Sequence, residues 1–353
     1  LLYMKIGFIV GKNNEICHNK ELKKITPKKY LVDCYDNGWK KNTLQIDVAI
    51  AMTIKSRFTG ITIDIILPNE ISLARLKKND INYVMGYDYV STLIQEPYVK
   101  KFVDNPQKLL DIYKNPNSKI YPPYSHQDFI WNKKKYLTKF KRANIPINPT
   151  IFIKGSVSIP KLLAQIASYN WSEFIVKPIG GCEGRGCGFF ILKDILAEPT
   201  KLIDYFTEES ETYEEYLVQR LTEGFKKYGE VKSFWIGGEF CYAINTKEVP
   251  WGDSVTKPET DEKVLEKCKE IGSKVIKTIP KSKFNGKTST PVMTRIDMVC
   301  CLDNKPKKSY AYYLNEIEEG GIAGTYTNAK GINYPIVEVL ADAYVRKANE
   351  LLK

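Results

Sequence analysis

The feature that most constrains this chain is a pattern of acidic residues on two apolar segments within 295–318. Asp297 interrupts the first segment, and Glu316 and Glu318 occupy alternate positions of the second. Side chains of a β-strand alternate between its two faces, so Glu316 and Glu318 point the same way. Turn-forming residues at 303–306, Asp-Asn-Lys-Pro, fold the second strand back towards Asp297. The pattern predicts a hairpin that brings three carboxylates together.

Three converging carboxylates require positive charge beside them. A cluster of oxygen ligands suits Mg²⁺, which proteins usually bind with one or two carboxylates plus substrate phosphates. The alternative is a solvated acidic hairpin, which has no need of apolar neighbours. The acids here are flanked by such residues: Ile296, Met298, Val299, Leu314 and Ile317. Asp297, Glu316 and Glu318 are therefore the candidate metal ligands.

Composition narrows the class of protein. A chain of 353 residues is long enough for one or two large domains with a substantial core. Its eight cysteines have no framework spacing, which favours free thiols in a reducing, cytoplasmic compartment over disulfides or zinc. The net charge of +12 comes from 53 basic and 41 acidic residues, but the lysines are spread along the whole chain. A nucleic-acid binder would need a basic module interleaved with aromatic residues, which we do not find.

The first part of the chain alternates strands and a helix. Apolar strands are expected at 4–12, 61–67 and 81–90, with a helix at 43–58. This alternation predicts a small parallel sheet. Residues 104–125, rich in Pro and Asn, read as a connection.

A helix at 128–143 follows, and from residue 150 short β-rich segments dominate. Strands are expected at 150–154, 174–179, 188–193, 216–221, 230–247 and 291–318. Helices are expected at 159–169, 198–206 and 260–278, and an amphipathic helix at 335–352. No apolar run approaches the roughly 20 residues that span a bilayer.

A glycine-rich loop follows the strand at 174–179. That strand carries Lys177, and five glycines come next: Gly180, Gly181, Gly184, Gly186 and Gly188. Glycines let backbone N–H groups crowd around an anion, and a nearby lysine adds charge. The loop is not a P-loop, because it lacks Gly-Lys-Ser/Thr and leads into a strand. A floppy hairpin is the alternative, and a lysine on an apolar strand argues against it.

The expected strand at 216–221 is apolar at its start and becomes polar from Gln219 onwards. Such a strand end can offer backbone groups to an adenine, with Glu223 placed to accept ribose hydroxyls. An ordinary strand end explains the same residues when they are taken alone.

Taken in order, these segments resemble the ATP-grasp superfamily over about 128–325. The matching residues are Asn132-Lys133, Val176-Lys177-Pro178 with the glycine loop, Gln219 to Glu223, Gly229 to Lys232, Arg295-Ile296-Asp297 and Asn315 to Glu318. The resemblance implies an α/β fold of three units: a Rossmann-like domain (1–125), a central lobe (126–212) and a C-terminal lobe with the terminal helix (213–353). Mg-ATP would bind between the two lobes.

The resemblance also implies roles for residues. Asp297, Glu316 and Glu318 would hold two Mg²⁺, and Arg295 and Lys232 would act on the transferred phosphate. The nucleotide contacts would be Lys133, Lys177, Gly181, Gly184, Gly186, Gln219, Arg220, Leu221, Glu223 and Glu230. Two residues depart from the family pattern. Glu318 stands where Asn is usual, and Lys232 where many members have Arg, which loses a bidentate fork.

The implied activity is an ATP-dependent ligase that joins a carboxylate to an amine through an acyl phosphate, releasing ADP and phosphate. A small-molecule kinase on the same fold, like the inositol phosphate kinases, is the alternative, and the positive charge suits its polyanionic substrates. A non-catalytic nucleotide-binding protein would have little need of three carboxylates. Expected partners are small-molecule or peptide carboxylates and amines, with a homodimer left open and no membrane. His126, just before the helix at 128–143, is a candidate for the acceptor site.

Overall fold

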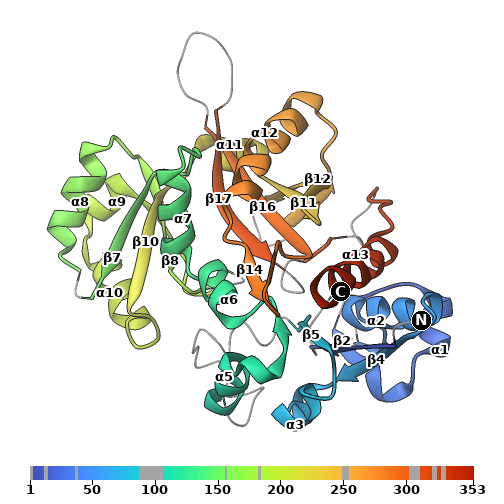
Figure 1. Ribbon diagram of the computed structural model, residues 1–353. Helices are drawn as coiled ribbons and strands as arrows, with labels where there is room; N and C mark the ends of the chain where they lie inside the picture. The colour runs from blue at the N-terminus through green and yellow to red at the C-terminus, as the bar shows by residue number, and fades with distance from the viewer. Residues whose placement is uncertain are drawn as a thin grey trace.

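A computed structural model of the protein describes residues 3–11, 15–35, 39–86, 106–155, 157–181, 184–248, 254–301, 311–319, 324–326 and 331–353. Three larger sheets organise these residues, with the third sheet lying between the first and the second (Figure 1). In the described part of the chain no helix is long and apolar enough to cross a membrane.

The first sheet is parallel, as the alternation of strands and helix predicted. Its order is β4 (Ile61–Ile66), β1 (Met4–Ile9), β5 (Ile81–Val84) and β6 (Ile120–Tyr121). The helix α2 (Ile46–Arg57) packs on it. Around the sheet lie α1 (Lys20–Ile25), the hairpin β2 (Val32–Tyr35) and β3 (Trp39–Thr43), and α3 (Leu73–Leu76). The expected connection at 104–125 contains a helix, α5 (Pro106–Lys114), as well as β6.

The terminal helix α13 (Ile336–Leu352) returns to the first sheet, where it packs against α2 (Figure 1). Its apolar residues share one core with β1 and α2, as Leu340, Tyr344 and Phe8 illustrate. The last segment in the chain is therefore a structural neighbour of the first. The domain boundaries taken from chain order remain a prediction.

The second sheet is antiparallel, with the order β7 (Thr150–Lys154), β10 (Glu215–Arg220), β8 (Glu173–Pro178) and β9 (Gly188–Ile191). The helices α8 (Ile159–Ser168), α9 (Leu192–Ala197) and α10 (Thr200–Glu209) share a core with one face of it. The other face points at the third sheet, because Leu217 of β10 belongs to the core cluster that β11 and β16 also build.

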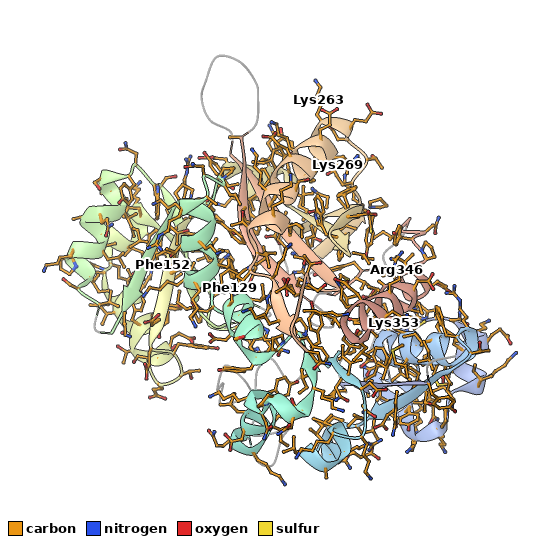
Figure 2. All side chains as sticks on the ribbon, in the orientation of Figure 1. Phe129, Phe152, Lys263, Lys269, Arg346 and Lys353 are labelled. Atoms are coloured by element: carbon orange, nitrogen blue, oxygen red, sulfur yellow. The ribbon has the colours of Figure 1, made fainter. Side chains whose placement is uncertain are left out.

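The third sheet has the order β13 (Ser254–Pro258), β12 (Glu239–Glu248), β11 (Glu230–Ile236), β16 (Met293–Cys301) and β17 (Ala311–Glu319). β16 and β17 form the predicted antiparallel pair, while the predicted turn at 303–306 lies outside the described residues. The helix α12 (Glu262–Thr278) covers one face, with Lys263 on its exposed side (Figure 2). The short elements α11 (Glu223–Tyr228), β14 (Ser282–Phe284) and β15 (Lys287–Ser289) complete this region.

The predicted single helix at 128–143 is two helices, α6 (Tyr124–Trp131) and α7 (Lys133–Arg142). Asn132 separates them with extended backbone angles (φ −100°, ψ 95°), and its side chain caps α7 by accepting a hydrogen bond from the N–H of Lys135 at 2.9 Å. The break turns α7 onto the core between the second and third sheets. Phe129 of α6 and Phe152 of β7, both labelled in Figure 2, also pack against that core.

Candidate functional site

The acidic residues identified in the sequence lie in two neighbouring rows across the third sheet. Strand register places Asp297 of β16 between Lys232 of β11 and Glu316 of β17. The next row places Arg295 opposite Glu318. Residues directly opposite each other share a face of the sheet. The three carboxylates therefore share one face of the third sheet with Lys232 and Arg295.

Ion pairs join these side chains into one network. Both oxygens of Asp297 accept hydrogen bonds from Arg295 at 2.8 Å, and Oδ2 also accepts one from Lys232 at 2.9 Å. Arg295 Nη2 lies 2.7 Å from Glu318 Oε1. Lys232 also pairs with Glu230, whose Oε1 accepts a hydrogen bond from the amide of Asn315 at 2.6 Å. Such a buried network holds charge in place because each partner compensates another.

The charges are compensated unequally, which the pKa values of the acids reflect. Burial raises the pKa of Asp297, but Arg295 and Lys232 outweigh it and bring that pKa below its usual value. Glu318 shares its cation, Arg295, with Asp297. Burial, with the nearby charges of Asp297 and Glu316, raises the pKa of Glu318 to about 7. Of the three candidate metal ligands, Glu318 is the one whose negative charge is compensated least.

Lys133 of α7 pairs with one of these carboxylates, and Lys177 of β8 contacts the neighbouring Asn315. Lys133 Nζ lies 2.9 Å from Glu316 Oε1 and donates a hydrogen bond to the carbonyl of Gly181 at 2.5 Å. Lys177 Nζ lies 3.5 Å from Asn315 Oδ1. These two lysines outweigh the effect of burial and lower the pKa of Glu316. The structure thus brings the lysines predicted to bind phosphate next to the candidate metal ligands.

The glycine loop begins beside Lys133 and has positive φ angles at Gly184 (+70°) and Gly186 (+65°). A Cβ atom at Gly186 would lie 2.7 Å from Pro178 and from the ring of Tyr213, so this position requires glycine for space as well as for backbone angle. Described parts of the loop therefore run close to the strand that carries Lys177.

Of the nucleotide contacts predicted at the end of β10, Arg220 and Leu221 line a narrow cleft between the second and third sheets, whereas Gln219 and Glu223 do not. Its volume is about 30 Å³, room for little more than a water molecule. The lining residues are Asn148, Ile175, Lys177, Phe189, Arg220, Leu221, Thr222, Phe225, Val299 and Asn315. Glu223, the expected ribose ligand, forms a half-exposed ion pair with Arg220 at 2.9 Å. A ligand the size of a base enters this cleft only if the two sheets move apart.

The carboxylates fit a divalent cation by chemistry, although the chain's own cations hold them here. In the ranges that the structure describes, no three His, Cys, Asp or Glu side chains are grouped as ligands of one metal ion. Arg295 and Lys232 occupy both oxygens of Asp297, and Arg295 also holds Glu318. Glu318 retains a poorly compensated charge, which is where added positive charge would be favourable. The assignment of these three residues to magnesium stays a prediction.

Sequence reasoning missed a contact between Glu15, near the N-terminal sheet, and the segment 324–326. Glu15 Oε2 accepts hydrogen bonds from the backbone N–H groups of Thr325 at 2.9 Å and Tyr326 at 3.0 Å, and from the Thr325 hydroxyl at 2.6 Å. The ring of Tyr326 in turn faces the guanidinium of Arg295 at 5.8 Å. No local pattern could indicate this pair, because 310 residues separate Glu15 from Thr325.

His126, the candidate for the acceptor site, is buried and bonded to Glu319 Oε2 at 2.7 Å. Burial lowers its pKa, but Glu319 outweighs burial and raises it. The pair ties α6 to the end of β17, one residue after Glu318. An acceptor role for His126 stays a prediction.

A much larger hollow, of about 760 Å³, lies among α8, α10 and the adjoining ends of β7 and β10. Its lining includes Ile203, Phe206 and Tyr213, and none of the predicted site residues. The predicted site residues therefore lie away from this larger hollow.

Comparison with known proteins finds similarity in structure and none in sequence. No protein-family model and no curated protein matches the sequence. The structure resembles D-cycloserine synthetase DcsG with a TM-score of 0.63 and 12% identity, covering 98% of this chain and 99% of that one. It resembles D-alanyl-alanine synthetase A from Vibrio cholerae with a TM-score of 0.60 and 12% identity, covering 99% of both chains.

A third similar structure is the ATP-grasp ligase PsnB, solved with a phosphomimetic variant of its minimal precursor, Mg and ADP. The TM-score is 0.56 at 12% identity, over 98% of this chain and 99% of that one. The three likenesses extend over nearly the whole chain and include the parallel N-terminal sheet. The protein therefore has the fold of the ATP-grasp ligases.

Proposed function

We propose that this protein is an ATP-dependent ligase that joins a carboxylate to an amine. The observation that carries the proposal is the buried network in which Lys232, Arg295 and Lys133 pair with four carboxylates of the third sheet. Buried charges on this scale cost stability unless they serve a purpose, and they cluster at functional sites. The glycine loop and Lys177 border the same network. Similar structures include ligases, among them one solved with ATP and one solved with Mg and ADP.

In this proposal the lysines and Arg295 leave the carboxylates and contact the phosphates of the nucleotide, and magnesium would take their place beside the carboxylates. Lys133 and Lys177 contact phosphates with the backbone of Gly181, Gly184 and Gly186, while Arg295 and Lys232 turn to the transferring phosphoryl group. Asp297, Glu316 and Glu318 would then hold magnesium. The metal would supply charge neutralisation between the phosphates. Gln219, Arg220, Leu221, Glu223 and Glu230 complete the nucleotide contacts.

The proposed reaction has two steps. An oxygen of the substrate carboxylate attacks the γ-phosphorus, the bond from that phosphorus to the bridging oxygen breaks, and ADP leaves with the electron pair. The amine nitrogen then attacks the acyl carbon, phosphate leaves, and the amine gives up a proton. Arg295 and Lys232 stabilise the negative charge that builds on the phosphoryl oxygens in the first step and on the acyl oxygen in the second. No covalent bond to the protein is required.

A kinase acting on a small polyanion is the second candidate, favoured by the net charge of +12. It would use the same first step with a hydroxyl in place of the carboxylate.

We also propose that the chain divides into three units, 1–125, 126–212 and 213–353, and that the protein is cytoplasmic.

Measurement of ADP release separates the two candidates. The purified protein is incubated with Mg-ATP and with amino acids, short peptides or inositol phosphates. The masses of the products are then measured by mass spectrometry. The ligase predicts a product lighter than its two substrates together by one water. A product heavier than one substrate by a phosphoryl group identifies the kinase. If no ADP is released with any of these substrates, both candidate functions are contradicted.

A further inference from the structure

A short segment after α7 crosses the base of the cleft and joins the two sheets that form it. The N–H of Leu314 on β17 donates to the carbonyl of Pro146 at 2.8 Å, and the N–H of Asn148 donates back to the carbonyl of Leu314 at 3.0 Å. On the other side, the N–H of Arg220 on β10 donates to the carbonyl of Pro149 at 3.2 Å. Asn148 therefore stands where the two walls of the cleft meet.

The side chain of Asn148 is held in one orientation. It is 4% exposed, and its Nδ2 donates a hydrogen bond to the carbonyl of Arg220 at 3.1 Å. A carbonyl can only accept, so the amide nitrogen must face Arg220 and the amide oxygen must point elsewhere. Within the part of the chain that the structure describes, this buried Oδ1 has no hydrogen-bond partner. An unpaired buried acceptor costs free energy until a donor reaches it.

A second acceptor in the same state lies next to Asn148. Gln219 is buried, and its Nε2 donates to Thr150 Oγ1 at 3.0 Å. That hydroxyl donates to the carbonyl of Asn148 at 2.6 Å. The Oε1 of Gln219 also lacks a partner among the described residues. One hydrogen-bonded chain thus links two amide oxygens that both await a donor.

The surroundings define the shape and chemistry of the missing donor. Five apolar side chains line the cleft beside Asn148: Ile175, Phe189, Leu221, Phe225 and Val299. Apolar walls suit a flat ring, and the unpaired oxygen of Asn148 suits a group on the edge of that ring that carries N–H bonds. The exocyclic amino group of adenine is such a group. Guanine and hypoxanthine carry a carbonyl oxygen at the same position, which would place acceptor against acceptor.

We propose that Asn148 recognises the base, with its Oδ1 accepting a hydrogen bond from the six-amino group of adenine. This inference rests on the proposed use of ATP and adds a residue that selects among purine nucleotides. Asn148 binds the base and takes no part in phosphoryl transfer. Because a site built around a substrate N–H leaves buried groups unpaired when that N–H is missing, it rejects analogues without it.

Calorimetric titration with three Mg-nucleotides tests the proposal. They are ADP, the diphosphate of purine riboside, which lacks the amino group, and inosine diphosphate. For the unchanged protein we expect ADP to bind roughly tenfold more tightly than purine riboside diphosphate, and inosine diphosphate to bind no better than the latter. Equal affinities would overturn the role of Asn148 while leaving ATP use intact. Failure of all three to bind would overturn the proposed function itself.

The variant Asn148→Ala separates recognition from structure. We expect the affinity for ADP to fall roughly tenfold and that for purine riboside diphosphate to change less than about twofold. A parallel loss for both nucleotides would show that Asn148 only supports the cleft. Asn349→Ala is the matched control, since Asn349 Nδ2 donates to a backbone carbonyl, that of Val345, at 3.0 Å on α13. If Asn148→Ala does not fold, the nucleotide series with the unchanged protein decides, together with Asn148→Ser.

Discussion

The two walls of the cleft differ in how their polar groups are satisfied. On the third sheet, Asp297, Arg295 and Lys232 neutralise one another without a ligand. At the base of the second sheet, Asn148 and Gln219 keep buried acceptors that lack partners among the described residues. Charges must be compensated because an isolated buried ion costs far more than an unpaired amide oxygen. A ligand would therefore replace existing ion pairs at one wall and fill vacant hydrogen bonds at the other.

The largest effect should come from breaking the charged wall. Asp297→Asn leaves Arg295 and Lys232 buried beside a neutral group, so we expect a loss of about 3–5 kcal/mol in the free energy of unfolding, together with loss of turnover. Urea denaturation measures the first and ADP release the second. Glu270→Gln is the control, because Glu270 is paired with exposed Lys267 and should change stability by less than about 0.5 kcal/mol. Similar losses in both variants would show that the buried network is coupled no more strongly than an exposed ion pair.

The next effect concerns a cation that is not held by the ion pairs of the third sheet. Lys177 contacts Asn315 at 3.5 Å. We expect Lys177→Ala to weaken binding of Mg-ATP by roughly 10- to 100-fold, since it removes a charge-assisted contact to phosphate, with little change in stability. Lys161→Ala, on the exposed side of α8, serves as control. Unchanged affinity in Lys177→Ala would mean that phosphates bind elsewhere.

A smaller effect should appear as a dependence of stability on pH. The pKa of Glu318 is about 7 in the folded protein, above its ordinary value of 4.5, so the folded state holds this proton more tightly than the unfolded state. Stability contributed by that proton is complete below pH 4.5 and is lost as pH rises to about 7. Glu318→Gln should therefore decline less between these pH values. Equal slopes of unfolding free energy against pH in both proteins would contradict the assignment.

The smallest effect should be a local change in motion. The glycine loop between β8 and β9 has few side chains to order it, so fixing it costs conformational entropy that phosphate contacts would offset. We expect amide exchange across residues 178–190 to slow when a non-hydrolysable ATP analogue binds, while exchange in α12 stays the same. Identical exchange with and without the analogue would show that the loop does not close over phosphates.

Local pattern was sufficient for much of the fold and for the charged wall. Alternation predicted that Glu316 and Glu318 share a face, and the turn signal predicted the pairing of β16 with β17. The parallel first sheet followed from the order of strand and helix segments. These features depend on periodicity within one or two elements, which sequence carries directly.

Tertiary structure decided the remaining features, because they join residues far apart in the chain. The contact of Glu15 with Thr325, the packing of α13 on α2 and the position of Asn148 between Arg220 and Leu314 have no local signal. The break between α6 and α7 at Asn132 also reflects packing, since a continuous helix was compatible with the sequence alone. The sequence by itself determined the position of acidic, basic and apolar residues along each strand. Only the folded chain determined which charges are compensated by an opposite charge and which buried acceptors lack a hydrogen-bond donor among the described residues.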